Sequence, residues 1–160
     1  PGKGKRHVLR LVRDILHHTP AHRTGDLRHA LQHLQKTFRR RAVMVVISDF
    51  LDPLPHSALH RAQRRHDVVA IQIIDPHEEQ LPALGRMTLE DAETGEVGEI
   101  NLRNEEELAD FFHHRAAEQE ELEKQFRGMN IDHILLRTGE PYMPELIKFF
   151  RMRLDRQRRP

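Results

Sequence analysis

Three short runs of apolar, mostly β-branched residues constrain the fold of this chain more than any other feature. They cover residues 42–47, 68–74 and 131–136. Their apolar residues scarcely alternate with polar ones, which is typical of strands covered on both faces, as in a parallel sheet. Segments with helical spacing separate the runs in a βαβ order. We therefore predict an α/β fold with a partial Rossmann-like parallel sheet and flanking helices.

Apolar residues at helical spacing predict helices around these strands. The expected helices cover about residues 5–18, 27–41, 57–66 and 104–127, and a last one begins near Pro141. Thr24 or Asp26 would cap the second helix, and Arg39 to Arg41 would end it. In the last helix, the residues expected to face the core are Leu146, Ile147, Phe149 and Phe150. Residues 87–102 suggest an inserted β-hairpin with a turn at 93–96. We expect one domain over residues 1–155 and a frayed basic tail over 156–160.

Length and composition limit the class of protein. The 160 residues, 38% of them hydrophobic, suit one core. Apolar runs reach only about seven residues, far below the roughly twenty of a membrane helix, so we expect a cytoplasmic protein without membrane contact. The chain has no cysteine, which excludes disulfides and a cysteine nucleophile.

The charges are unevenly distributed along the chain. Residues 1–66 contain 14 Lys and Arg against 4 Asp and Glu, residues 67–123 contain 3 against 17, and residues 124–160 contain 9 against 4. Such segregation suits a charged partner, but the simpler interpretation is that the segments neutralise one another on folding.

Carboxylates follow two of the predicted strands. Asp49 and Asp52 come after the first strand and Asp75 after the second. The carboxyl ends of parallel strands are the usual ligand edge of an open α/β sheet, and clustered carboxylates there can hold Mg²⁺. This arrangement leaves open a metal-dependent hydrolase or phosphoryl-transfer enzyme. The structural alternatives are that Asp52 caps the helix near Pro53 and that Asp75 begins the turn at Pro76.

Other polar motifs are weaker. The histidine pairs His29/His33 and His56/His60 have helical spacing, but zinc needs three or four convergent ligands, so we interpret them as solvated side chains. The basic clusters lack interleaved aromatic residues, because the chain has one Tyr and no Trp. A nucleic-acid-binding module therefore remains only a second alternative.

Several motifs together resemble one bacterial family. Residues 40–52, RRAVMVVISDFLD, are similar to the most recognisable stretch of the domain of unknown function 58 family, a relative of the von Willebrand factor type A fold. Further similar segments follow in the expected order: residues 4–11, the RHDVV at 65–69, the LEDAETGE at 89–96, and Thr138 to Tyr142. The resemblance covers nearly the whole chain.

The resemblance implies a metal-ion-dependent adhesion site. In that fold, a D-x-S-x-S loop, a threonine and a strand-end aspartate hold a divalent ion. Here Asp49 matches the aspartate, and Thr24 stands one position away from the threonine, with Asp26, Ser48, Asp52 and Asp75 as further rim residues. The D-x-S-x-S motif is absent, as expected of a C-terminal portion that starts downstream of the first three strands. We therefore expect no cofactor and no tight metal binding here, with Mg²⁺ held only in a longer parent protein.

The function implied by the resemblance is recognition and not catalysis. The family works beside MoxR-type AAA+ ATPases in protein assembly or maturation, so we expect a non-catalytic interaction module of a larger protein. Because the first strands are missing, the edge of residues 42–47 would be open. An open apolar edge pairs with other strands, which predicts self-association through this segment.

Overall fold

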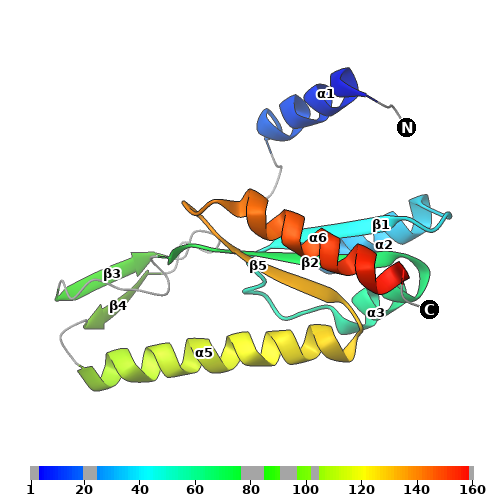
Figure 1. The fold of residues 1–160 in the computed structure, drawn as a ribbon. Coiled ribbons are helices and arrows are strands. Elements are labelled where there is room, and N and C mark those ends of the chain that lie inside the picture. The colour runs from blue at the N-terminus through cyan, green and yellow to red at the C-terminus, as the bar shows by residue number, and fades with distance from the viewer. Residues whose placement is uncertain (1–3, 20–24, 77–84, 91–96, 102–104, 159–160) are drawn as a thin grey trace.

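A three-stranded parallel sheet forms the centre of the protein. The computed structural model describes residues 4–19, 25–76, 85–90, 97–101 and 105–158. The strands β1 (Val43–Ser48), β2 (Asp67–Ile74) and β5 (Asp132–Arg137) lie in the order β1-β2-β5, with β2 in the centre. These strands confirm the predicted α/β class and the partial Rossmann-like sheet (Figure 1).

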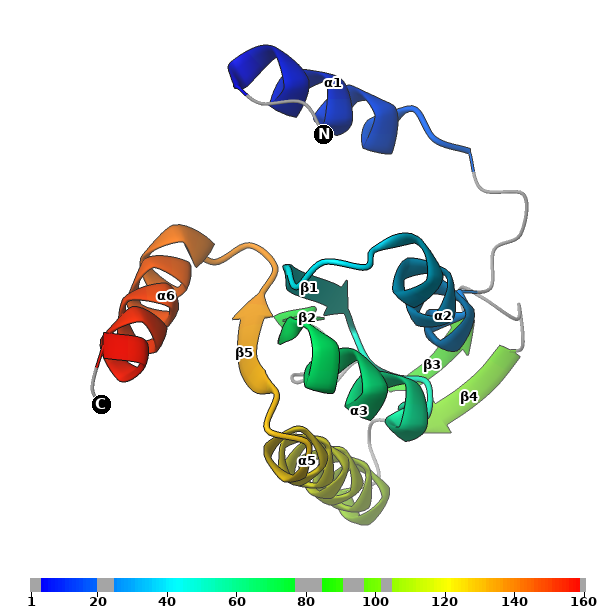
Figure 2. The same cartoon turned by 90° about the vertical axis from the view of Figure 1, so that its right-hand side faces the viewer.

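Helices cover the two faces of this sheet unequally. On one face lie α2 (Leu27–Thr37), α3 (His56–Arg65) and α5 (Glu105–Gly128), and on the other lies α6 (Tyr142–Arg158) (Figures 1 and 2). The hairpin of β3 (Arg86–Glu90) and β4 (Val97–Asn101) is a separate antiparallel pair beside the amino end of α5. Its expected turn at 93–96 lies outside the described residues.

The larger core packs between the sheet and the first three of these helices. Leu31, Leu59, Val68 and Phe126 are each at most 1% exposed. The Phe126 ring stacks on the His133 imidazole at 5.0 Å between centroids. A smaller cluster on the other face joins β2 and β5 to α6.

The sheet is anchored at its amino edge by a buried arginine of α6. Arg153 is 8% exposed and contacts the carboxylates of Asp67 and Asp132, which begin β2 and β5. Its guanidinium also lies 5.8 Å from the centroid of the Phe149 ring. Arg156 donates to Asp132 at 2.8 Å. The expected frayed tail is therefore wrong for residues 156–158, which continue α6.

Two further expectations about helices are wrong. α2 ends at Thr37, so Arg39 to Arg41 lie in the connection to β1 and not in the last turn of the helix. In α6, Phe149 is buried as predicted, but Ile147 and Phe150 are 45% and 41% exposed because they lie one step around the helix from the buried stripe.

The strand β1 also departs from expectation, since it is covered on one face only. Met44 and Val46 pack against the larger core, whereas Val43, Val45 and Ile47 are exposed on the α6 side of the sheet. α6 covers β2 and β5 and does not extend over β1 (Figure 2). The sequence could not show this, because an apolar run predicts coverage without saying whether a covering element exists.

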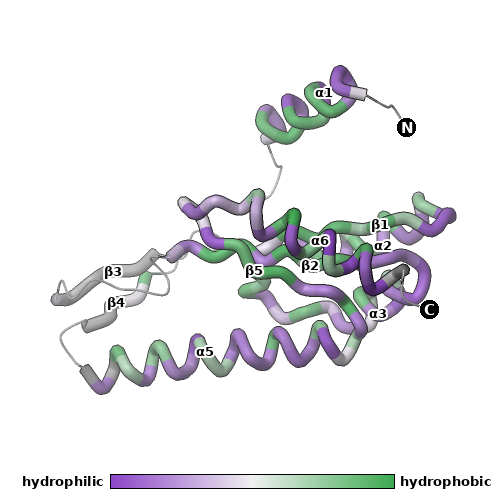
Figure 3. Tube along the Cα trace, viewed as in Figure 1, coloured by the Kyte–Doolittle hydropathy of each residue, from purple (hydrophilic) through white to green (hydrophobic). Residues whose placement is uncertain are grey.

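The helix α1 (Lys5–Leu16) stands apart from the sheet, on the same side as α6 but towards β1 (Figures 1 and 2). None of its residues is buried. Apolar residues form a stripe along it, visible as green segments in Figure 3. The exposed fractions of this stripe range from 46% to 77% over Val8, Leu9, Leu11, Val12, Ile15 and Leu16.

Candidate functional site

The loop after β1 carries the candidate aspartates in an unusual backbone conformation. Phe50 has φ of 57°, a left-handed conformation that costs a bulky residue roughly 1–2 kcal/mol. Its ring is buried and meets the Phe126 ring edge-on at 5.1 Å. The Phe50 N–H donates to the Ser48 hydroxyl at 3.1 Å, and the Leu51 N–H donates to the Asp49 carboxylate at 3.3 Å. Packing and local hydrogen bonds thus hold Asp49 on an exposed turn.

A buried glutamine connects this loop to α5 and β5. Gln72, in the central strand, is 5% exposed, and its Nε2 donates to the Asp49 carbonyl at 3.3 Å and to the Gln119 Oε1 at 2.9 Å. In return, the Gln119 Nε2 donates to the Gln72 Oε1 at 3.0 Å, and the His133 Nε2 lies 3.0 Å from the same oxygen. Since an amide oxygen only accepts, the His133 Nε2 carries the proton. This network fixes α5 relative to the carboxyl edge of the sheet.

The environment of His133 disfavours its charged form. Burial lowers the pKa of His133 below its ordinary 6.5, and the nearby Arg127 lowers this pKa further, while Glu123 opposes the shift. The ring is therefore neutral at pH 7, and it donates to Gln72 as a neutral imidazole.

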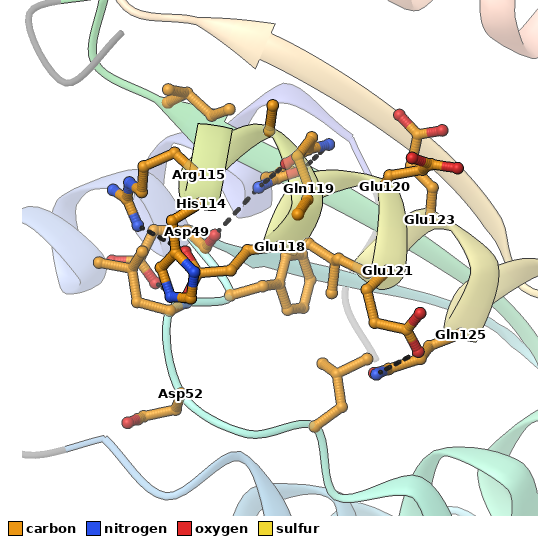
Figure 4. Close-up of a pocket in the computed structure, with 18 of the residues that line it drawn as sticks. Asp49, Asp52, His114, Arg115, Glu118, Gln119, Glu120, Glu121, Glu123 and Gln125 are labelled. Atoms are coloured by element: carbon orange, nitrogen blue, oxygen red, sulfur yellow. Dashed lines mark hydrogen bonds and ion pairs between the residues drawn. The ribbon is translucent and has the colours of Figure 1, made fainter. Parts of the chain in front are cut away.

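A cleft of about 1050 Å³ opens between this loop and α5. Its walls are residues 49–54 of the loop, the end of β2 from Gln72 to Ile74, and the α5 side chains from Phe112 to Gln125 (Figure 4). Apolar side chains contribute to these walls, among them Phe112, Leu122 and Leu51, and Leu51 is 59% exposed. The cleft therefore lies at the carboxyl edge of the sheet, the usual ligand edge of α/β proteins.

Acidic side chains dominate the charge of the cleft. Some are paired along α5: Glu118 lies 3.3 Å from the His114 Nε2, and Glu120 lies 3.0 Å from the Lys124 Nζ. In Figure 4, Glu120 and Glu123 point away from the loop, whereas Glu121 points towards the loop side. Asp49, Asp52 and Glu121 therefore leave a negative rim, which favours cationic groups.

The structure brings together only part of the predicted site. Asp49 and Asp52 both line the cleft, and both are exposed. Ser48 donates from its hydroxyl to the Asp49 carboxylate at 3.3 Å. Asp26 caps α2 by accepting the His29 N–H at 2.8 Å, as one of the two predicted caps. The other, Thr24, lies outside the described residues.

Of the two remaining carboxylates, Asp52 does not have its predicted structural role, and the turn predicted to begin at Asp75 continues outside the described residues. Asp52 does not cap α3, because the N-cap residue is Pro55 and no side chain accepts there. Asp75 follows β2 as predicted and is exposed, but it is not part of the cleft wall.

The donor set does not fit a tightly held metal ion. Within the part of the chain that the structure describes, no group of three or more His, Asp or Glu side chains could hold a metal ion. Mg²⁺ prefers octahedral oxygen coordination and keeps its waters unless several carboxylates converge. Asp49 and Asp52 alone do not supply such a shell.

Sequence reasoning missed Gln72, Gln119 and His133. Gln72 is the one polar residue between Val68 and Ile74, which was a usable signal, because a buried amide needs partners. The identity of those partners had no signal, since they lie 47 and 61 positions away along the chain.

These features define a class of protein: an α/β protein whose partial Rossmann-like sheet carries an acidic cleft at its carboxyl edge. The chain belongs to the family described as "Protein of unknown function DUF58", whose model matches residues 1–122. It is 34% identical over 149 residues to the uncharacterized protein Rv1480 of Mycobacterium tuberculosis and to the uncharacterized protein Mb1516 of Mycobacterium bovis.

The coverage of the relatives differs. Each of those two alignments covers 91% of this chain and 47% of the relative, so the chain spans about half the length of these relatives. The uncharacterized protein MAV169 of Mycobacterium avium is 33% identical over 130 residues, which cover 81% of this chain and 76% of that protein. No solved structure matches significantly. Among the described residues, no helix is both long and apolar enough to cross a membrane.

Proposed function

We propose that this chain is a non-catalytic protein-interaction module of a larger protein and that its contact surface is the acidic cleft. The observation that carries the proposal is the rim of the cleft, where the exposed Asp49 and Asp52 stand beside the exposed Leu51. Exposed carboxylates beside an exposed apolar side chain suit the recognition of a polypeptide with basic and apolar residues.

The strained turn at Phe50 supports the same assignment. Residues in sparsely populated backbone conformations persist where the surrounding structure determines them, and they cluster at functional sites. Here the buried Phe50 ring and the hydrogen bond from the Gln72 amide hold the turn on its core side, so the Asp49 carboxylate faces outward. A fixed presentation lowers the entropy cost of binding a partner.

Asp49 is proposed to be the remnant of a metal-ion-dependent adhesion site. The donor set does not fit a metal ion, so recognition by this chain would proceed through the carboxylates themselves. The family resemblance suggests a MoxR-type AAA+ ATPase as the partner, and it also suggests a role in protein assembly or maturation. We further propose self-association through residues 42–47, since β1 is an apolar edge strand.

A calorimetric titration that measures the affinity of the chain for a MoxR-type AAA+ ATPase tests the proposed role of the cleft. The combined substitution Asp49→Asn and Asp52→Asn should weaken binding about fivefold, because each exposed rim charge contributes about 0.5 kcal/mol. Asp14→Asn is the matched control, since Asp14 is an exposed α1 carboxylate paired with Arg13 and should have no effect. EDTA should also have no effect.

Three results would contradict the proposal. An absence of binding would exclude this partner class, and equal affinity of the doubly substituted variant would exclude the cleft. Loss of binding in EDTA would show that a cation takes part, against the carboxylate-only mechanism.

A further inference from the structure

The outer edge of β1 presents unpaired backbone groups. The Asp67 N–H donates to the Ala42 carbonyl at 2.9 Å, so the backbone groups of residue 42 point towards β2. Successive residues of a strand alternate in this direction. The N–H and C=O groups of Val43, Val45 and Ile47 therefore point away from β2, and no strand in the described part of the chain pairs with them.

The same three residues also expose their side chains. Val43, Val45 and Ile47 are 62%, 44% and 65% exposed, on the face of the sheet that α6 leaves uncovered. A long apolar edge strand with free hydrogen-bonding groups is a template for another strand. The charged residues, proline and bulges that commonly protect such edges are absent from VMVVIS, the sequence of β1.

We infer that this edge is the docking site for the β1 edge of a second copy of the chain, with the two strands antiparallel across a two-fold axis at Val45. The inference rests on the self-association proposed above and gives it a geometry. A second copy is the occupant because the edge is self-complementary. In each copy, no strand of the described residues pairs with this edge, and each copy offers the other an apolar strand with unpaired backbone groups. A two-fold contact of this kind closes on itself and yields a dimer, not a fibre.

The position of the axis follows from the direction of the backbone groups. Outward-pointing residues can bond only to outward-pointing residues of the other copy. With the axis at Val45, Val45 lies opposite its own counterpart and Val43 lies opposite Ile47, so every outward N–H and C=O of the three residues finds a partner. An axis at Met44 or Val46 would leave one end residue opposite a position beyond the strand.

The two-fold axis also has a consequence for the side chains. Because it runs perpendicular to the sheet, it places the exposed side chains of both copies on the same face. The two apolar strips then join across the new strand pair, and the three-stranded sheets become one continuous sheet.

Engineered cysteines test this register directly, because the chain has no cysteine of its own. Residues opposite one another in hydrogen-bonded antiparallel pairs have Cα atoms about 5.5 Å apart, within disulfide reach. Val45→Cys should therefore form a covalent dimer under mild oxidation. Val43→Cys is the control, since its own counterpart would be displaced by about 13 Å along the strand. A mixture of Val43→Cys and Ile47→Cys chains, one isotopically labelled, should cross-link as a heterodimer.

Sedimentation of the full chain supplies the second measurement. The unmodified chain should dimerise at high concentration, and Val45→Lys should raise the dissociation constant at least tenfold, because it places a charge at the centre of the interface. The circular dichroism spectrum should be unchanged, since the Val45 side chain is outside the core. A dimer that cross-links through residue 43 as readily as through residue 45 would overturn the register alone. A compact monomer at high concentration would overturn both the register and the proposed self-association.

Discussion

Replacement of Gln72 should show how much the buried amide network contributes to stability. The substitution Gln72→Leu keeps a similar volume but removes the donor to the Asp49 carbonyl and both bonds with Gln119, and it leaves the His133 Nε2 without its acceptor. A net hydrogen bond contributes about 1 kcal/mol, and an unsatisfied buried partner costs about 1–3 kcal/mol. We therefore expect a loss of about 3 kcal/mol in the free energy of unfolding.

A double-mutant cycle with Gln119→Leu isolates the amide pair. The two side chains exchange bonds of 2.9 Å and 3.0 Å, so each single substitution leaves the other amide unpaired. In the double variant, two leucines face each other and neither amide remains unsatisfied. The double variant should be about 1–2 kcal/mol more stable than the sum of the single effects predicts.

Urea unfolding followed by circular dichroism measures all four proteins of the cycle. In a chain of this size, the Gln72→Leu loss corresponds to a fall in Tm of about 6–12 °C. Leu135→Met is a suitable control, because it changes a neighbouring half-buried side chain of β5 outside the network. Additive effects, with a coupling below about 0.3 kcal/mol, would refute the argument that the amides act as a unit.

Four other perturbations have expected outcomes. The unmodified chain should lose stability as the pH falls below about 6.5, because a lowered folded-state pKa of His133 means that the unfolded state binds the proton first; His133→Gln should flatten this part of a pH series of urea titrations. Arg153→Met should cost about 3–5 kcal/mol in thermal unfolding, since it leaves Asp67 without its cation and Asp132 with only the exposed Arg156. His66→Leu should raise stability by about 1 kcal/mol, because neither ring nitrogen of this 1% exposed histidine has a hydrogen-bond partner within the described residues; a fall would show that the ring has a partner. Val12→Asp places a charge in the apolar stripe of α1, the helix expected to dock on the paired β1 strands, so it should weaken the dimerisation that sedimentation measures. Arg10→Gln, on the polar face of α1, should not weaken it.

The sequence predicted most of the secondary structure because periodicity is a local property. The three strands and most helix ends lie within a few residues of their predicted positions, and Asp26 caps α2 as one of two proposed caps. The errors arose where the outcome depends on distant elements. Ile147 and Phe150 have helical spacing typical of a core face, yet the sheet meets only the neighbouring stripe of α6. Periodicity gives the width of an apolar stripe and not the part of it that finds a partner.

The candidate site was less predictable than the fold. Parallel-sheet topology alone placed Asp49 and Asp52 at the carboxyl edge, and both line the cleft there. The opposite wall comes from α5, most of which lies in the acidic segment of residues 67–123, and the sequence linked that segment only to a charged partner or to neutralisation on folding. The contact between that wall and the sheet depends on Gln72 and Gln119, and no local pattern pairs residues so far apart.

Two exposed apolar stripes, one on β1 and one on α1, lie on the same side of the sheet, and this placement connects the two elements. On the other face, β1 packs into the larger core through Met44 and Val46. On the α6 side, β1 and α1 each leave an apolar stripe uncovered, and Figure 2 places α1 towards β1. In the inferred dimer, the exposed side chains of the two β1 strands form one apolar strip, and a helix with an apolar stripe can cover it. α1 carries an apolar stripe of which no residue is buried, so dimerisation and the docking of α1 should occur together.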